Sequence, residues 1–304
     1  MLIFNIIISL FNLNLNSIYN LNNQLNKLIL PKSLKTISDN AFSGCGVTTL
    51  NLDLDSNLET IGNSAFESTK ITQFTFPSSL KSIGNKAFAS SNVKNVDYSS
   101  NSKLETIGDM AFASTSDLIS LRVPSNVKYL GNNAFEGSKI KYLYIEQDSK
   151  LEYIGSDLFK NNKYITYIGR YYEVLPEVFT LNIPSSVKEI GNYAFDSIKF
   201  DELVLPVNSK LEIIGQGAFM NNTKVSVVSI PDSVKIIKAD AFKNNTHLET
   251  INFKDSSSIA FIDSTAFEST KYVSSLTTKG EEIRFVNVLY KARISVLVNV
   301  SRTL

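Results

Sequence analysis

The sequence is poor in the residue types on which most chemistry depends. Its 304 residues include no tryptophan, one cysteine and one histidine, and 30 basic residues are balanced by 29 acidic ones. Cys45 alone cannot form a disulfide within the chain. His247 alone supplies neither a histidine-rich metal site nor a catalytic base with a partner. Because the basic residues form no run or stripe, the usual signal for nucleic-acid binding is also missing.

Glycine is also used sparingly, and the glycines stand singly, so no glycine-rich loop is available to hold a phosphate group. The glutamates recur with the repeat described below, so their spacing reflects stacking and not an acid–base pair. The sequence therefore predicts a non-enzymatic protein with no catalytic residues, no cofactor, no metal and no nucleic-acid partner.

Long hydrophobic runs are missing as well. The apolar residues 1–11 are too few to span a bilayer. They have the length of a signal peptide but no basic n-region and no small-residue cleavage site. Two interpretations stay open, a cleaved secretory signal and a strand that caps the first repeat. Near the other end, the apolar residues 283–300 are interrupted by Arg284, Lys291 and Arg293. We predict no integral membrane span.

The sequence does contain a repeat. The phrase Ile-Gly-x-x-Ala-Phe recurs in whole or in part, and the intervals between its phenylalanines are 24, 22, 24, 23, 24, 36, 24, 23 and 25 residues. The ten residues are Phe42, Phe66, Phe88, Phe112, Phe135, Phe159, Phe195, Phe219, Phe242 and Phe267. This period indicates a solenoid in which each copy contacts only its neighbours. We call each copy a coil and each set of equivalent positions a column.

Every coil has the same order of segments. An apolar-x-x-apolar-x-apolar segment comes first, as at residues 71–76, and its alternation predicts a short strand with one buried face. A turn and a second short extended piece follow, as at residues 80–83, before the glycine and the Ala-Phe corner. The Phe column predicts a stacked aromatic spine. The Gly column predicts a corner that needs either positive φ or close backbone approach.

We therefore expect a mainly β solenoid of about ten coils of ~23 residues, with little α-helix. Residues 1–24 would be the signal peptide or N-terminal cap, residues 25–279 the solenoid, and residues 280–304 a C-terminal cap. The single long interval, between Phe159 and Phe195, predicts an irregular insert at about residues 164–177.

One column alternates in charge along the repeat. It contains Lys35, Glu59, Lys81, Glu105, Lys128, Glu152, Lys188, Glu212 and Lys235. Since neighbouring coils would place opposite charges side by side, we predict a surface charge ladder. Unpaired, solvated charges are the alternative.

The phrase Ile-Pro-Ser-Ser-Val-Lys-x-Ile-Gly-x-x-Ala-Phe at residues 183–195 resembles the BspA-like leucine-rich repeat family. Residues 230–242 match nearly as well, and the resemblance extends over residues 25–272. It implies a strand-rich leucine-rich-repeat solenoid in a cell-surface or secreted microbial protein used for adhesion and protein binding. The chain departs from the family at the residue four after the Phe, usually Cys there, which is Gly46 in the first coil, with Cys45 beside it.

The outward positions of the predicted first strands supply a candidate binding surface. By alternation they are the pairs Thr49/Asn51, Gln73/Thr75, Asn95/Asp97, Ser120/Arg122, Tyr142/Tyr144, Thr180/Asn182, Glu202/Val204, Val227/Ser229 and Thr250/Asn252. Most of these residues are small and polar, and the two tyrosines stand out.

Tyr142 and Tyr144 precede the insert, which is itself rich in tyrosine. The insert carries Tyr164, Tyr167, Arg170, Tyr171 and Tyr172. Because Tyr and Arg are enriched at binding hot spots, we hypothesise that this Tyr-rich region binds a partner protein. The alternative is that the tyrosines pack over a defect in the stack.

Three N-x-Ser/Thr sequons begin at Asn221, Asn244 and Asn299, and the first two stand two residues after the Phe of their coils. They matter only if the chain enters a secretory pathway, and chance is the alternative because asparagine is abundant here.

These observations favour a protein-recognition or adhesion module at the cell surface or in secreted form, with a host or matrix protein as partner. A cytoplasmic leucine-rich-repeat scaffold is the alternative. Unpaired strand edges at the ends of the solenoid would also allow self-association.

Overall fold

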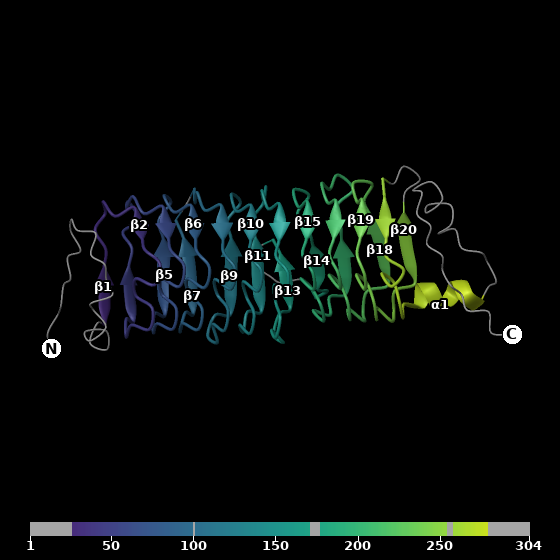
Figure 1. Ribbon diagram of the computed structural model, residues 1–304, viewed down its shortest axis with the longest axis horizontal. Helices are drawn as coiled ribbons and strands as arrows, with labels where there is room; N and C mark the ends of the chain where they lie inside the picture. The colour runs from purple at the N-terminus through teal and green to yellow at the C-terminus, as the bar shows by residue number, and fades with distance from the viewer. Residues whose placement is uncertain (1–25, 100, 171–176, 254–257, 279–304) are drawn as a thin grey trace. The chain divides into compact units, whose positions relative to one another are not determined.

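The computed structural model describes residues 26–99, 101–170, 177–253 and 258–278 (Figure 1). The predicted caps at 1–24 and 280–304 lie outside these ranges, as do Tyr171, Tyr172 and Asn299. The chain divides into two compact units, Met1–Leu175 and Pro176–Leu304.

In the first unit, every coil contributes a two-residue strand to one parallel sheet. These strands are β2 (Thr36–Ile37), β4 (Thr60–Ile61), β6 (Ser82–Ile83), β8 (Thr106–Ile107), β10 (Tyr129–Leu130) and β12 (Tyr153–Ile154). They pair in register, so that Ile37 lies beside Ile61 and Ile61 beside Ile83. We call this the short-strand face.

The apolar-x-x-apolar-x-apolar segments of the first unit form a second set of parallel strands, the long-strand face. They are β1 (Lys27–Ile29), β3 (Thr49–Asn51), β5 (Gln73–Phe76), β7 (Asn95–Tyr98), β9 (Ser120–Val123), β11 (Tyr142–Ile145) and β13 (Tyr167–Gly169). Hydrogen-bonded pairing joins β1 with β3, β5 with β7, and β9 with β11 and β13. β3 lies beside β5, and β7 beside β9.

The second unit repeats this arrangement. Its two-residue strands are β15 (Glu189–Ile190), β17 (Ile213–Ile214), β19 (Ile236–Ile237) and β21 (Phe261–Ile262), and its longer strands are β14 (Thr180–Asn182), β16 (Glu202–Val204), β18 (Val227–Ile230) and β20 (Thr250–Phe253). One helix, α1 (Lys271–Thr278), follows the last coil. The described residues thus form a β-solenoid of about ten turns with almost no helix, which confirms the predicted fold class.

The Phe column forms the predicted aromatic spine in both units. Phe88 and Phe112 stack with ring centroids 5.5 Å apart and 6° between planes, and Phe242 and Phe267 stack at 5.2 Å and 12°. Phe66, Phe112 and Phe219 are fully buried. Burying an aromatic ring in every coil gives each coil–coil interface a large apolar contact, and a stacked pair adds about 0.5–1.5 kcal/mol beyond its buried area.

The Gly column is explained by close approach and not by positive φ. A Cβ atom on Gly131 would lie 2.3 Å from the backbone carbon of Gly108 in the preceding coil, and one on Gly155 would lie 2.3 Å from the carbonyl oxygen of Gly131. The described glycines with positive φ are Gly44, Gly137 and Gly217, which belong to other columns. Glycine is therefore required where the backbones of neighbouring coils touch.

A buried polar column lies three residues after the Phe. It is one position before the column in which the related family usually has cysteine and this chain has Gly46 in the first coil. Thr69, Thr115 and Thr270 each donate a hydroxyl hydrogen bond to the carbonyl oxygen of their own coil's Phe, at 2.8–2.9 Å. Ser91 and Ser138 do the same. The buried Cys45 occupies this column in the first coil. The column satisfies a turn carbonyl that is shut away from water.

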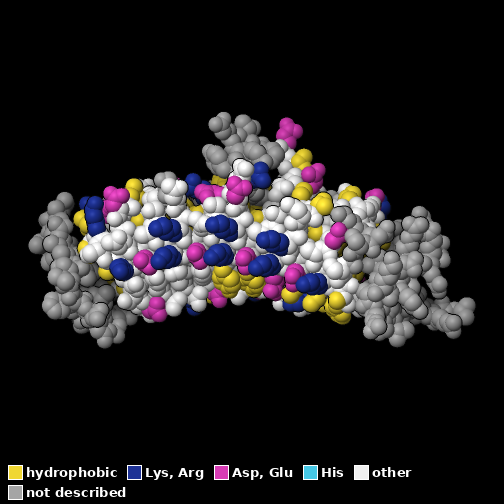
Figure 2. Space-filling view, turned by 90° about the horizontal axis from the view of Figure 1, so that it is seen from above, with side chains coloured by type: hydrophobic (Ala, Val, Ile, Leu, Met, Phe, Trp, Pro, Cys, Tyr) yellow, Lys and Arg dark blue, Asp and Glu magenta, His cyan; other side chains and the backbone are white. Residues whose placement is uncertain are grey.

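Pairs of the predicted charge ladder are present in both units, and Figure 2 shows basic and acidic side chains alternating on the face that it views. The distances between lysine Nζ and glutamate oxygens are 2.7 Å for Lys81–Glu59, 3.0 Å for Lys128–Glu105 and 2.9 Å for Lys235–Glu212. These side chains are about half exposed, so each pair adds only about 0–1 kcal/mol of stability.

Candidate functional site

The tyrosine-rich region lies on the long-strand face of the first unit. In the parallel register, Tyr142 of β11 lies between Ser120 of β9 and Tyr167 of β13, and Tyr144 lies between Arg122 and Gly169. The rings of Tyr142 and Tyr144 stack at 6.2 Å, and that of Tyr167 lies 5.9 Å from Tyr144. The structure therefore brings three of the predicted residues into one cluster, which we call the tyrosine surface.

The members of this cluster differ in exposure. Tyr142 and Tyr144 are half-buried, because alternation turns both away from the core. Tyr167 is only 4% exposed, and its hydroxyl donates a 2.6 Å hydrogen bond to the carbonyl of Arg170. Its hydroxyl covers Gly169, where a Cβ would lie 2.9 Å from it. Tyr167 thus packs beneath the surface, as the alternative interpretation expected of the tyrosines, while Tyr142 and Tyr144 are half-exposed.

Two charged residues border the tyrosines: Arg122, which the sequence placed among the outward strand positions, and Glu146, which the sequence did not single out. Arg122 follows Ser120 on β9 and lies 3.4 Å from Glu146 between Nε and Oε1. Its Nη2 donates a hydrogen bond to the carbonyl of Tyr98, and its guanidinium lies 5.9 Å from the ring of that residue. These contacts hold Arg122 beside Tyr144. The outward position predicted for Arg122 is thus the one that the structure shows beside Tyr144.

Two other predicted residues flank β13 in the sequence, while Tyr171 and Tyr172 lie outside the described residues. Tyr164 is 44% exposed, and Arg170 is exposed directly after β13. β13 itself falls within the predicted insert, where it adds a regular parallel strand beside β11. The extra length of this coil is therefore used in part to extend the long-strand face, which positions Tyr167.

A second tyrosine pair, not anticipated from the sequence, lies on the short-strand face. Tyr129 and Tyr153 stack with centroids 4.9 Å apart and 9° between planes. Their hydroxyls point toward Asp109 and Asn132. Burial, with a smaller effect of the Asp109 carboxylate, raises the pKa of Tyr129 to about 12. The neutral phenol is therefore the form that this face favours.

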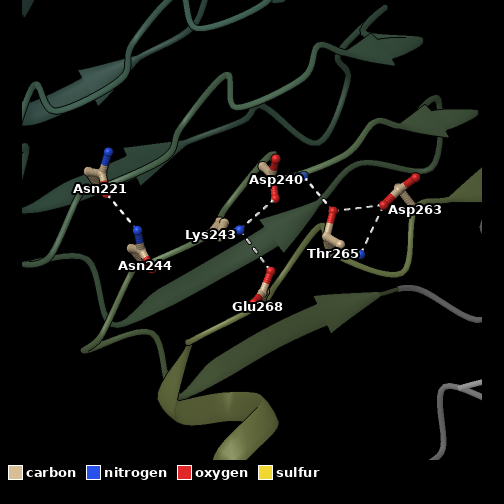
Figure 3. Close-up of polar contacts among 7 residues, drawn as sticks. All are labelled: Asn221, Asp240, Lys243, Asn244, Asp263, Thr265 and Glu268. Atoms are coloured by element: carbon tan, nitrogen blue, oxygen red, sulfur yellow. Dashed lines mark hydrogen bonds and ion pairs between the residues drawn. The ribbon is translucent and has the colours of Figure 1, made fainter. Parts of the chain in front are cut away.

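The asparagine side chains of the first two sequons take part in hydrogen bonds between neighbouring coils of the second unit (Figure 3). Asn244 Nδ2 donates a 2.9 Å hydrogen bond to Asn221 Oδ1, and Asn221 Nδ2 donates one of 2.8 Å to Asp196. Beside them, Lys243 bridges Asp240 at 3.2 Å and Glu268 at 2.9 Å. Each sequon amide is thus part of a contact between neighbouring coils. The third sequon lies outside the described residues.

Within the described ranges, no group of three or more His, Cys, Asp or Glu side chains is placed to hold a metal ion. Among these same residues, no helix is both long enough and apolar enough to cross a bilayer.

Comparison with known proteins supports the resemblance seen in the sequence. The family model described as "BspA type Leucine rich repeat region" matches in 6 copies, over residues 12–141, 99–175 and 175–274. No curated protein matches the chain.

Among solved structures, the pneumococcal vaccine antigen PcpA is 31% identical, with a TM-score of 0.50, over 75% of this chain and 58% of that one. A leucine-rich repeat protein from Bacteroides ovatus is 20% identical, with a TM-score of 0.46, over 86% and 76% of the two chains. A leucine-rich cell surface protein from Faecalibacterium prausnitzii is 18% identical, with a TM-score of 0.37, over 83% and 65%. The chain thus spans little more than half of the pneumococcal antigen.

Proposed function

Because the chain belongs to the BspA type leucine-rich repeat family, we propose that it is a non-enzymatic protein-recognition module that mediates adhesion at the cell surface or in secreted form. The tyrosine surface is the part of the module that contacts the partner, a host or matrix protein. The family supports the general role in protein interaction, and the similarity to the pneumococcal vaccine antigen supports the location.

The observation that carries this proposal is the position of Tyr142 and Tyr144. They are half-exposed, their rings stack on each other, and that of Tyr144 also contacts the buried Tyr167. Tyrosines held in this way lose little freedom on binding, and Tyr and Arg are the residues most enriched at binding hot spots. Arg122, fixed by Glu146 and Tyr98, supplies a charged group at the border of the same surface.

The location is tested on intact cells of the source organism that produce the full chain with a C-terminal tag. A membrane-impermeant reagent is applied before lysis. The proposal predicts that the tag is labelled and that the mature protein has lost its first residues. A protein that stays unlabelled with Met1 or Leu2 intact would favour the cytoplasmic scaffold.

The contact surface is tested by placing a photo-crosslinking amino acid at position 144 of the full chain, and at the exposed position 252 of the second unit as a control. After irradiation in the presence of purified extracellular-matrix proteins, we expect a crosslinked product from position 144 only. Equal crosslinking at both positions, or none at 144, would refute the assignment of the tyrosine surface.

A further inference from the structure

A groove of about 790 Å³ lies on the long-strand face of the first unit, over β1, β3, β5, β7 and β9. The outward side chains that line it are Thr49, Asn51, Gln73, Thr75, Asn95, Asp97 and Ser120. The groove ends where the tyrosine surface begins, because Ser120 lies beside Tyr142 in the register. The groove is lined by polar residues of the candidate binding surface predicted from the sequence, and the tyrosine surface does not include them.

Among the described residues, three amide side chains of this groove have no side-chain hydrogen-bond partner. No other described residue makes a side-chain hydrogen bond with Asn51, Gln73 or Asn95, and all three are exposed. The second unit is different at equivalent positions. There, Thr180 donates to Glu202 at 2.9 Å, and Asn252 donates to Ser229 at 3.1 Å.

The groove therefore offers an ordered array of free donors and acceptors. Each amide supplies two N–H donors and an acceptor oxygen, and each hydroxyl supplies one donor and two acceptor positions. Gln73 and Asn95 are register partners, as are Thr75 and Asp97, so the outward side chains form two rows along the stack. By the repeat, Thr49 of the preceding coil belongs to the first row and Asn51 to the second. Because adjacent parallel strands are about 4.8 Å apart, each row presents a polar group in every coil, at a spacing close to the length of one pyranose ring.

The charge of the lining narrows the choice of ligand. Asp53 and Asp97 are its charged residues, and it includes no lysine or arginine. Asp53 is already paired with Lys32 at 3.1 Å. An anionic ligand would meet the carboxylate of Asp97 without a compensating cation from the lining, so a neutral ligand fits better.

A protein segment fits this groove less well than a sugar. Its floor is the face of strands, where side chains project and backbone groups do not, so strand addition is not available there. The exposed apolar residues lie at one end, at Ile29 and Leu54, and the lining contains no Tyr, Trp or Arg. The apolar and aromatic anchors that dominate protein interfaces are thus few, whereas hydroxyl-binding groups are many.

We propose that this groove binds a linear, uncharged oligosaccharide of hexose units that runs along the stack, with about one sugar unit for each coil. The hydroxyls of the sugar exchange hydrogen bonds with the amides of Asn51, Gln73 and Asn95. This site is separate from the tyrosine surface, and it does not depend on the proposed protein partner.

The test measures binding of the full chain to neutral linear hexasaccharides of glucose or mannose, in α-1,4, β-1,3 and β-1,4 linkages, by titration calorimetry. The variant combines Asn51→Ala, Gln73→Ala and Asn95→Ala. Its matched control combines Asn182→Ala, Ser229→Ala and Asn252→Ala in the second unit. We expect at least one hexasaccharide to bind to the unmodified chain. The groove variant should bind it at least about tenfold more weakly, and the control variant should bind it with unchanged affinity.

All six positions are exposed strand residues, so the variants should fold, and unfolding midpoints verify this. If the triple variant does not fold, Gln73→Lys replaces it, because it places a long charged side chain in the middle of the groove. The proposal is overturned if no hexasaccharide binds at millimolar concentration, or if both triple variants bind equally well. It is also overturned if a sulfated hexasaccharide or a short peptide occupies the groove in preference.

Discussion

Substituting Gly131 with alanine tests whether coil contact, and not turn conformation, determines the Gly column. The new Cβ would lie 2.3 Å from the backbone carbon of Gly108 and 2.4 Å from the backbone nitrogen of Asp109. Neither atom belongs to a flexible side chain. Carbon atoms in good contact are about 3.5–4.0 Å apart, so the two coils would have to separate by about 1 Å.

That separation acts on the bonds that join the two coils. Gly131 donates its N–H to the carbonyl of Ile107 at 2.8 Å, and the neighbouring Tyr129 and Leu130 pair with β8. Weakening two or three such bonds costs about 1 kcal/mol each, and overpacking adds about 1–3 kcal/mol. We expect the variant to lose at least about 3 kcal/mol of unfolding free energy.

The control is Gly137→Ala in the adjacent turn. Gly137 has φ +62°, but its nearest neighbour to a new Cβ is the Ser114 hydroxyl at 3.4 Å. Its substitution should cost only the left-handed backbone penalty of about 1–2 kcal/mol. Lys238 and Asp263 occupy the Gly column in the last two coils, where their N–H groups still donate to the preceding coil, to Ile214 at 3.0 Å and to Ile237 at 2.9 Å.

Both variants are measured by urea denaturation monitored by circular dichroism, with slopes compared to verify two-state behaviour. The reasoning fails if Gly131→Ala is no more destabilising than Gly137→Ala.

Four further outcomes are expected. Thr115→Val removes a buried hydroxyl bond to the Phe carbonyl and should lower the unfolding free energy by about 1–3 kcal/mol; a change below that of an exposed-site control would contradict the role of this column. Because the pKa of Tyr129 is raised to about 12, the neutral phenol should contribute stability that is complete below pH ~10 and is lost as the pH rises to about 12. A Tyr129→Phe variant should not lose this stability, and an identical pH profile of unfolding for both proteins would contradict the role of Tyr129. Glu105→Lys should lower the melting temperature more in low salt than in high salt, since it places three lysines in succession; no salt effect would exclude the charge ladder. In a glycosylating host, mass spectrometry should find a glycan on at most one of Asn221 and Asn244 in any folded molecule, because their side chains touch; double occupancy would refute this.

The features that sequence alone could predict are those carried by a column. The repeating Phe predicted the spine, and the alternating Lys and Glu predicted the charge ladder, because stacking converts a period into contacts. The outward strand positions followed from alternation in the same way. In each case the prediction needs only the kind of residue at equivalent positions of the repeat and the spacing between these positions.

The features that sequence could not predict depend on distances between coils. The Gly column was compatible with positive φ or with close approach, and only the 2.3 Å distance that a Cβ on Gly131 would have from the backbone of Gly108 decides between them. The burial of Tyr167 depends on Gly169, which leaves room for its ring. The free amides of Asn51, Gln73 and Asn95 look like any outward polar residues until their neighbours are known.

The most direct test of the account is the affinity of the Tyr142→Ala/Tyr144→Ala variant for the matrix protein that crosslinks to position 144. Unfolding midpoints are measured in parallel, with Thr180→Ala/Asn182→Ala as control. Because both tyrosines are half-exposed, we expect nearly unchanged stability and an affinity loss of at least about 2 kcal/mol, roughly thirtyfold. Unchanged affinity, or a loss that only follows unfolding, would show that the tyrosines serve packing and would contradict the account.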